Sequence, residues 1–368
     1  MRFPEFTGEW KKCIIGDLAT KVGSGVTPRG GESVYKTDGH PFVRSQNVGF
    51  GHLILDDIAF IDEETHQRQK NTELQLDDVL LNITGASIGR SALVNTQVVE
   101  GNVNQHVCII RTRNNLVPSF LCNFLLSNHG QKQIDSFQAG GNRQGLNFEQ
   151  IKSIKIAIPS IDEQNKVAKL LQLIEERIST QNKIIKKYES LIKGLAVALT
   201  AKGKPNIAIS QSLECHSSTL QESEVLPNGL YKVFGASGLV GYINTAQMNG
   251  DAILIIKDGS GVGTVSYAQG KFSVIGTLNY LTVIGNNDLR YMYFALSVFN
   301  FQPYKTGMAI PHIYFKDYGS AKIFCPPLIE QKRIANMLGK LESKLFWEQE
   351  LLRLFNQQKR HLLGQMFI

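Results

Sequence analysis

The chain has 368 residues and a formal net charge of +7, so it is longer than most single hydrophobic cores and long enough for two domains. Its composition, 42% hydrophobic and 19% charged, excludes a disordered chain, and no stretch reaches the roughly 18 apolar residues of a membrane span. The basic charge favours a polyanionic partner, and the absence of an apolar signal-peptide core at the N-terminus predicts a cytoplasmic location.

The first part of the chain, up to about residue 158, alternates short apolar runs with glycine-rich turns. The segment from Asp78 reads DVLLNITGASIGR, an apolar strand followed by glycines that permit positive φ angles. This pattern predicts a mixed domain over residues 1–158.

A long amphipathic helix is predicted next, within residues 159–203. Asp162 is expected to cap its start, and apolar residues then recur with a spacing of three and four over five heptads. The residues that fill one heptad position are Leu171, Ile178, Ile185, Ile192 and Leu199. Such a seam is typical of a coiled coil.

The same order then repeats, with a second domain at 204–325 and a second helix at 326–368. The segment KIAIPSIDEQNKVAKLLQLIEE from Lys155 aligns without a gap on KIFCPPLIEQKRIANMLGKLES from Lys322, an offset of 167 residues. Within the preceding domains, DAILIIKDGSGVGT from Asp251 matches the segment from Asp78 if one residue is inserted. In the second helix the heptad position is taken by Leu338, Leu345 and Leu352, and Lys359 interrupts it.

The repeat predicts an α+β protein in which two mixed domains alternate with two long helices. If the helices pair as an antiparallel coiled coil, the two halves are related by a pseudo-twofold axis. The alternative is two separate amphipathic helices, each packed only on its own domain.

These motifs resemble the specificity subunits of type I restriction-modification systems, and the resemblance covers nearly the whole chain. The repeated joins, IPSIDEQ from Ile158 and CPPLIEQ from Cys325, are similar to the boundary between a target-recognition domain and a conserved spacer helix in that family. The segments EWKKCIIGDLATKVGSGVTP from Glu9, PFVRSQNV from Pro41 and YKVFGASGLVGYI from Tyr231 also look like family motifs. The second half lacks the GSGVTP opening.

The resemblance implies a non-catalytic subunit that recognises an asymmetric, bipartite site in double-stranded DNA. Residues 1–158 and 204–325 would be the target-recognition domains, and 159–203 and 326–368 the spacer helices. The implied partners are two methyltransferase subunits and the restriction subunits, with no membrane involved. S-adenosylmethionine, ATP and Mg are expected in those partner subunits, and no cofactor in this chain.

Base recognition requires side chains that present paired donors and acceptors to groove edges, and loops between strands suit them best. The candidates in the first domain are Arg44, Ser45, Gln46, Asn47, Arg90, Asn104, Gln105, Arg143 and Gln144. Those in the second domain are Lys257, Ser260, Lys305 and His312. The alternative for each of them is a solvated loop group or an amide that stabilises a turn.

Catalytic signatures are absent from the sequence. It contains no Asn/Asp-Pro-Pro-aromatic methylation motif, no GxxxxGK[ST] phosphate loop, no HExxH and no CxxC pair, so we expect neither catalysis nor a metal site. The five scattered cysteines are predicted to be buried small side chains. Two alternative functions stay open: the recognition part of a self-sufficient restriction and methylation enzyme, and a coiled-coil scaffold whose domains bind proteins.

Overall fold

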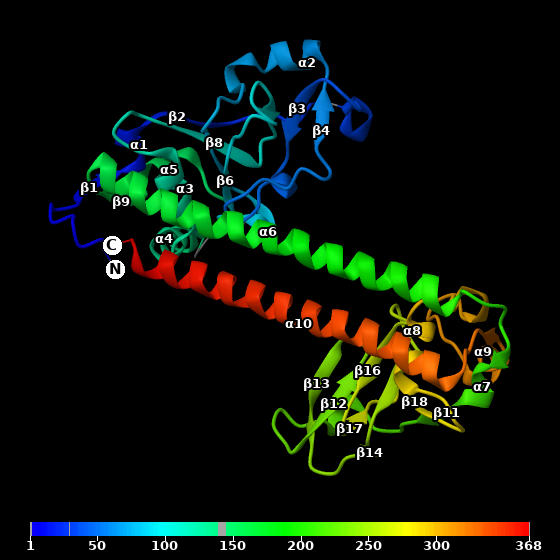
Figure 1. Cartoon of the computed structure of the whole chain (residues 1–368). Coiled ribbons are helices and arrows are strands. Elements are labelled where there is room, and N and C mark those ends of the chain that lie inside the picture. Colours follow the sequence, from blue (N-terminus) through cyan, green and yellow to red (C-terminus); the bar gives the residue numbers. More distant parts are fainter. Residues whose placement is uncertain (1, 29, 139–144, 368) are drawn as a thin grey trace. The chain divides into compact units, whose positions relative to one another are not determined.

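The computed structural model describes residues 2–28, 30–138 and 145–367, and the chain divides into two compact units (Figure 1). Unit 1 comprises Met1–Gln181 and Leu351–Ile368, and unit 2 comprises Asn182–Glu350. The two long helices are α6 (Ile161–Thr200) and α10 (Leu328–Gln365). Each of them has one segment in unit 1 and the other in unit 2. Among the described residues, no helix is long and apolar enough to cross a membrane.

Unit 1 is built around a four-stranded antiparallel sheet. Its strands lie in the order β2 (Ala19–Ser24), β8 (Val107–Thr112), β5 (Val79–Asn82) and β6 (Ser91–Leu93). A second sheet has the order β4 (Ala59–Ile61), β3 (His40–Val43) and β7 (Asn102–Val103), and a separate pair joins β1 (Lys11–Ile14) to β9 (Lys155–Ile158). All four residues of β5 are buried, because both faces of this central strand are covered.

Short helices complete unit 1. The α-helices are α1 (Ile15–Leu18), α2 (Glu63–Arg68), α3 (Pro118–Leu126), α4 (Asn128–Gln138) and α5 (Phe148–Ser153). The 3-10 turns are η1 (Gly31–Val34), η2 (Ser45–Asn47), η3 (Lys70–Thr72) and η4 (Gly85–Ser87). Phe120 and Phe124 of α3 are fully buried in a core that also contains Leu171 of α6 and Leu362 of α10. The main sheet and the long helices therefore share one hydrophobic core in this unit.

Unit 2 repeats this architecture. Its main sheet has the order β11 (Leu213–Ser217), β18 (Leu278–Val283), β15 (Ala252–Ile256) and β16 (Val265–Ala268). The second sheet has the order β13 (Gly238–Ile243), β12 (Tyr231–Gly235), β17 (Lys271–Val274) and β14 (Met248–Asn249), and β10 (Ile207–Ala208) pairs with β19 (Lys322–Ile323). The helical elements are α7 (Ile209–Ser212), η5 (Glu222–Glu224), α8 (Leu289–Ser297), η6 (Gln302–Tyr304) and α9 (Phe315–Tyr318). The expected α+β class, with two mixed domains and two long helices, is confirmed.

Within each unit, α6 and α10 run antiparallel. In unit 1 the first half of α6, with Ile174 and Ile178, shares a core with the end of α10 at Leu362. In unit 2 the end of α6, at Ala196, shares a core with the start of α10 at Leu338. Of the heptad residues, Leu171, Ile178, Ile185 and Leu338 are buried, whereas Ile192, Leu199, Leu345 and Leu352 are half-buried. Each helix therefore contacts more than its own domain.

A glutamine holds the start of each long helix in the same way. The Gln164 side chain donates from Nε2 to the Pro159 carbonyl at 3.0 Å and accepts at Oε1 from the backbone N–H of Val117 at 2.8 Å. Gln331 donates to the Pro326 carbonyl at 2.8 Å and accepts from the N–H of Asp288 at 2.8 Å. Val117 and Asp288 are the residues that precede α3 and α8. The two aligned sequence segments therefore make equivalent hydrogen bonds in the two units.

The predicted cap at Asp162 is wrong by two residues. The helix begins at Ile161, and the Ser160 hydroxyl accepts a hydrogen bond from the N–H of Glu163 at 3.4 Å. The capping side chain belongs to the residue just before the first helical residue, and this residue is Ser160. The cysteine prediction holds for Cys108 and Cys122, whereas Cys13, Cys215 and Cys325 are only half-buried.

Candidate nucleic-acid interface

A glycine turn follows β5 in unit 1. The N–H of Gly89 donates to the Asn82 carbonyl at 3.0 Å and closes the turn, which contains η4. Gly85 and Gly89 have φ angles of 69° and 84°, a left-handed conformation that favours glycine. The turn brings polar groups to the end of an otherwise apolar strand.

Two other loops contact this turn. The Asn82 side chain donates to the carbonyl of Ser45, which begins η2 after β3, at 2.8 Å. The N–H of Ile83 donates to the His106 carbonyl at 3.0 Å, and the Thr84 hydroxyl lies 2.6 Å from Nδ1 of His106. Two of the predicted polar clusters, residues 44–47 and 104–106, thus lie beside the same turn.

Contacts inside the 44–47 loop use several of its polar groups. Arg44 and Gln46 both contact the Asp57 carboxylate, at 3.1 and 2.6 Å, and the Arg44 guanidinium lies 5.3 Å from the centroid of the Tyr35 ring. Asn47 is buried and donates to the Ile54 carbonyl at 2.9 Å. These contacts fix the loop shape and leave Ser45 half-buried and Gln46 exposed.

The other candidates in unit 1 differ in accessibility. Gln105 is exposed, whereas Asn104 is buried and accepts at its side chain from the N–H of His106 at 3.1 Å. Arg90 is half-buried, with its guanidinium 5.4 Å from the Phe50 ring centroid. Arg143 and Gln144 lie outside the described residues.

Unit 2 presents an equivalent turn after β15. The N–H of Gly263 donates to the Ile256 carbonyl at 2.9 Å, as Gly89 does to Asn82, and Gly263 has a φ of 87°. A bridge between Asp258 and His312 corresponds to the one between Thr84 and Gly145 in unit 1. Both halves therefore place a loop from just before α5 or α9 against the glycine turn.

All four candidates of unit 2 lie in or beside this arrangement. The carbonyl of Lys257 accepts from the N–H of Ile313 at 2.9 Å, next to His312. Ser260 is exposed in the turn itself. Lys305 is half-buried and precedes Thr306, which exchanges two backbone hydrogen bonds with His312.

A polar pocket of about 430 Å³ opens at this place in unit 2. Its walls include Lys257, Asn279, Tyr314 and Lys316. The thiol of Cys215 also lines it, and burial raises the pKa of Cys215 to about 11 although the charge of Lys257 lowers it, so the thiol is neutral at pH 7. Amide, ammonium and aromatic groups in one concave site are the groups that contact nucleobases and phosphates.

Sequence reasoning missed Thr84 in unit 1 and Asn279, Tyr314 and Lys316 in unit 2. Tyr314 and Lys316 flank Phe315, which the repeat aligns with Phe148, so the repeat offered a signal for this segment. Asn279 gave no signal, because it lies within the apolar run of β18 and reaches the pocket only through strand pairing.

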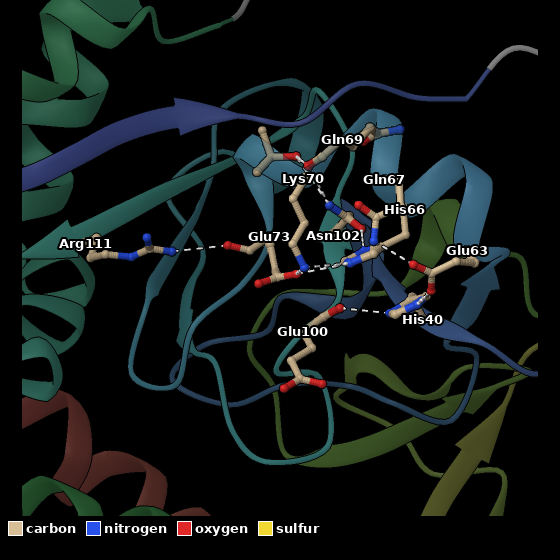
Figure 2. Close-up of polar contacts among 11 residues, drawn as sticks. His40, Glu63, His66, Gln67, Gln69, Lys70, Glu73, Glu100, Asn102 and Arg111 are labelled. Atoms are coloured by element: carbon tan, nitrogen blue, oxygen red, sulfur yellow. Dashed lines mark hydrogen bonds and ion pairs between the residues drawn. The ribbon is translucent and has the colours of Figure 1, made fainter.

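A second polar cluster in unit 1, drawn in Figure 2, joins α2 and η3 to β3 and β7. His66 is buried, stacks on His40 with ring centroids 3.7 Å apart, and contacts Asn102 Oδ1 at 2.7 Å and Glu73 at 3.0 Å. Lys70 donates to Glu73 and holds the pKa of that carboxyl below its usual value. The described residues include no group of His, Cys, Asp and Glu suited to a metal ion. Because the histidines and Glu73 contact one another and Asn102, this cluster is a structural network that ties α2 to the sheet.

The family follows from the sequence over most of the chain. The model of the type I restriction modification DNA specificity domain matches residues 7–190 and 213–353. This chain belongs to the type I DNA specificity family. The two matched segments correspond to the two halves of the repeat, which confirms the family indicated by the sequence motifs.

Known specificity subunits support this assignment. The chain is 22% identical over 203 residues to a protein named as the type I restriction enzyme MjaX specificity subunit of Methanocaldococcus jannaschii, covering 54% of this chain and 47% of that protein. It is 24% identical over 168 residues to the EcoBI specificity subunit of Escherichia coli, covering 45% of this chain and 35% of that one. The chain thus spans about half or less of the length of these relatives. Their names describe specificity subunits, not methyltransferases or nucleases.

A solved structure shares the fold. The type I restriction-modification S subunit from M. genitalium superposes with a TM-score of 0.66 at 16% identity, covering 100% of this chain and 99% of that one. The likeness in fold therefore extends over the whole chain.

Proposed function

We propose that this chain is the non-catalytic DNA-specificity subunit of a type I restriction-modification complex and reads an asymmetric, bipartite site in double-stranded DNA. The observation that carries the proposal is the repeated glycine turn, which has the same backbone contacts in both units but different side chains around it. Thr84 lies in the first turn with His106 beside it, whereas Lys257 and Asp258 lie in the second. One scaffold with two sets of side chains suits two different half-sites.

The recognition domains in this proposal occupy residues 1–158 and 204–325, and the spacer helices occupy 159–203 and 326–368. The accessible candidates for the first half-site are Ser45, Gln46, Arg90 and Gln105. Lys257, Ser260, Lys305 and His312 are those for the second. Basic groups beside both turns would contact phosphates, so affinity should fall as salt increases.

Methyltransferase and restriction subunits are the proposed protein partners, with S-adenosylmethionine, ATP and Mg bound by them. In unit 2, a groove of about 840 Å³ along α6 and α10 is lined by Leu191, Met337 and Leu341 and by the basic residues Lys332 and Arg333. Apolar walls with a basic rim suit an amphipathic helix that carries acidic residues, and we propose that a methyltransferase subunit supplies it.

The decisive test is methylome sequencing of cells that express this chain with its cognate methyltransferase subunit. A bipartite methylated motif that appears only when both proteins are present is the expected result. Lys257→Ala should relax one half of that motif and Gln105→Ala the other, whereas Lys132→Ala, an exposed substitution in α4, should relax neither. Methylation without this chain, or DNA binding that shows no salt dependence and no sequence preference, would refute the proposal and favour a protein-binding scaffold.

A further inference from the structure

The two long helices carry a glutamate at the same position of the repeat. Glu175 follows Leu171 by one helical turn in α6, and Glu342 follows Leu338 in α10, again at an offset of 167 residues. The Glu175 side chain is 20% exposed and that of Glu342 is 23% exposed. Both carboxylates face their recognition domain rather than solvent alone, although the two domains offer them unrelated partners.

In unit 1, Glu175 joins a loop to both helices. One carboxylate oxygen lies 2.9 Å from Nδ1 of His52, and the other accepts from the ammonium of Lys359 in α10. The Lys359 ammonium also donates to the Phe50 carbonyl at 2.9 Å. Lys359, the residue that interrupts the heptad pattern, is therefore used to attach the loop at residues 50–52 to the helix pair.

That loop is the direct continuation of the proposed DNA-facing loop. Asn47, the last residue of η2, accepts at its carbonyl from the N–H of Ile54 at 2.8 Å and returns a side-chain hydrogen bond to the Ile54 carbonyl. The N–H of Gly51 donates to the carbonyl of Ser91, the first residue after Arg90. A displacement of the loop from Glu175 would therefore move two of the candidate base-reading segments.

In unit 2, Glu342 contacts α8. It pairs with the Arg290 guanidinium at 2.5 Å and accepts from the Tyr293 hydroxyl at 2.7 Å. The guanidinium also lies 4.3 Å from the centroid of the Tyr267 ring. Tyr267 belongs to β16, the strand that follows the glycine turn containing Ser260. Through the Arg290 guanidinium, Glu342 is thus linked to β16, which begins two residues after Gly263 of the second glycine turn.

We propose that Glu175 and Glu342 are positioning residues, each of which orients the recognition loops of its own unit on the helix pair. The proposal rests on the proposed function. In this proposal neither carboxylate contacts DNA. Each carboxylate fixes the position of side chains that contact bases, and base recognition depends on that position because hydrogen bonds to base edges weaken steeply with misalignment.

The test uses the assembled methyltransferase complex and DNA in which either half-site is scrambled. Glu175→Gln should reduce discrimination against the scrambled half read by unit 1 by about tenfold, with discrimination at the other half unchanged. Glu342→Gln should do the reverse. Glu176→Gln, which removes the same charge from an exposed neighbour on α6, should change neither. If either single variant lost discrimination at both half-sites, or at neither, the proposal would be overturned.

Two further variants separate positioning from loss of folding. Tyr293→Phe removes one hydrogen bond to Glu342 and keeps every charge and the aromatic ring, so it should weaken discrimination at the second half-site while the complex still folds and unfolds cooperatively. Arg290→Gln combined with Glu342→Gln should cost less discrimination than the sum of the two single variants, since the two residues share one contact. If the wild-type complex itself shows no sequence preference, the proposed function fails, whereas a selective wild type with equally selective variants refutes only the positioning role.

Discussion

Opposing effects act on the ionisation of Glu175. Burial raises its pKa, but the hydrogen bond from His52 and the charge of Lys359 outweigh burial, so the pKa lies below its usual value. A carboxyl whose pKa is lower in the folded state stabilises that state when ionised. Its contribution is therefore complete above the unfolded pKa of about 4.3 and is lost as the pH falls through the folded pKa.

The lowered pKa of Glu175 predicts that the effect of Glu175→Gln on stability depends on pH. At pH 7 the substitution should lower the free energy of unfolding by about 2 kcal/mol, the usual worth of a hydrogen bond to a charged group. The difference in free energy of unfolding between wild type and variant should become smaller below about pH 4, where the wild-type carboxyl is itself protonated. Urea unfolding between pH 3 and pH 7 measures this difference, with Glu176→Gln as control. A difference that stays constant with pH would show that the carboxylate charge is not what stabilises unit 1.

At the same scale, the sequence predicted which loops are polar but not which polar groups are accessible. Arg44 and Asn47 are polar loop residues of the kind that contacts bases, yet their side chains bind within the loop. Arg44 contacts the Asp57 carboxylate, and Asn47 donates to the Ile54 carbonyl. Glu175 and Glu342 lie within the aligned repeat, but their partners are 123 and 52 residues away along the chain. Such contacts depend on tertiary packing, which the periodicity of a single segment does not encode.

At the scale of elements, the join between domain and helix depends on one buried amide. Gln331 is 2% exposed and satisfies both the Pro326 carbonyl before α10 and the N–H of Asp288 before α8. Leucine has a similar volume but no polar atom, so it would leave both backbone groups buried without a partner. The heptad spacing predicted both long helices because it is a local signal, whereas this amide's partners and the strand order of each sheet are set by long-range contacts.

Gln331→Leu should therefore destabilise unit 2 by about 2 to 6 kcal/mol, since it leaves two buried groups unsatisfied and each costs about 1 to 3 kcal/mol. Gln164→Leu should do the same in unit 1, where the equivalent amide holds Pro159 and Val117. Gln172→Leu, at an exposed position of α6, is the matched control and should cost less than about 0.5 kcal/mol. Chemical denaturation measures all three. Equal effects of Gln172→Leu and Gln331→Leu would contradict the assigned role of the amide.

At the scale of the whole molecule, the two units have separate hydrophobic cores around separate sheets. Phe120 and Phe124 lie in the core of unit 1, and Tyr291 and Phe294 lie in that of unit 2. The domain at residues 204–325 meets α10 through the core of unit 2, which includes Leu338 of α10, and through polar contacts of α8 and the position before it, made by Asp288, Arg290 and Tyr293. Related domains that pack on the long helices through an equivalent apolar face should be exchangeable if these polar contacts are kept.

We therefore predict that replacing residues 204–325 by the corresponding domain of another specificity subunit, with Asp288, Arg290 and Tyr293 retained, changes only one half of the methylated motif. The other half should persist, because it is read by unit 1, and the distance between the halves should persist, because both long helices are unchanged. A second chimera that also replaces Arg290 and Tyr293 by residues that cannot contact Glu342 serves as the control. It should give the same new half-site with weaker discrimination. Methylome sequencing of both chimeras measures this, and a change in both halves of the motif in the first chimera would show that the two recognition domains are not independent readers.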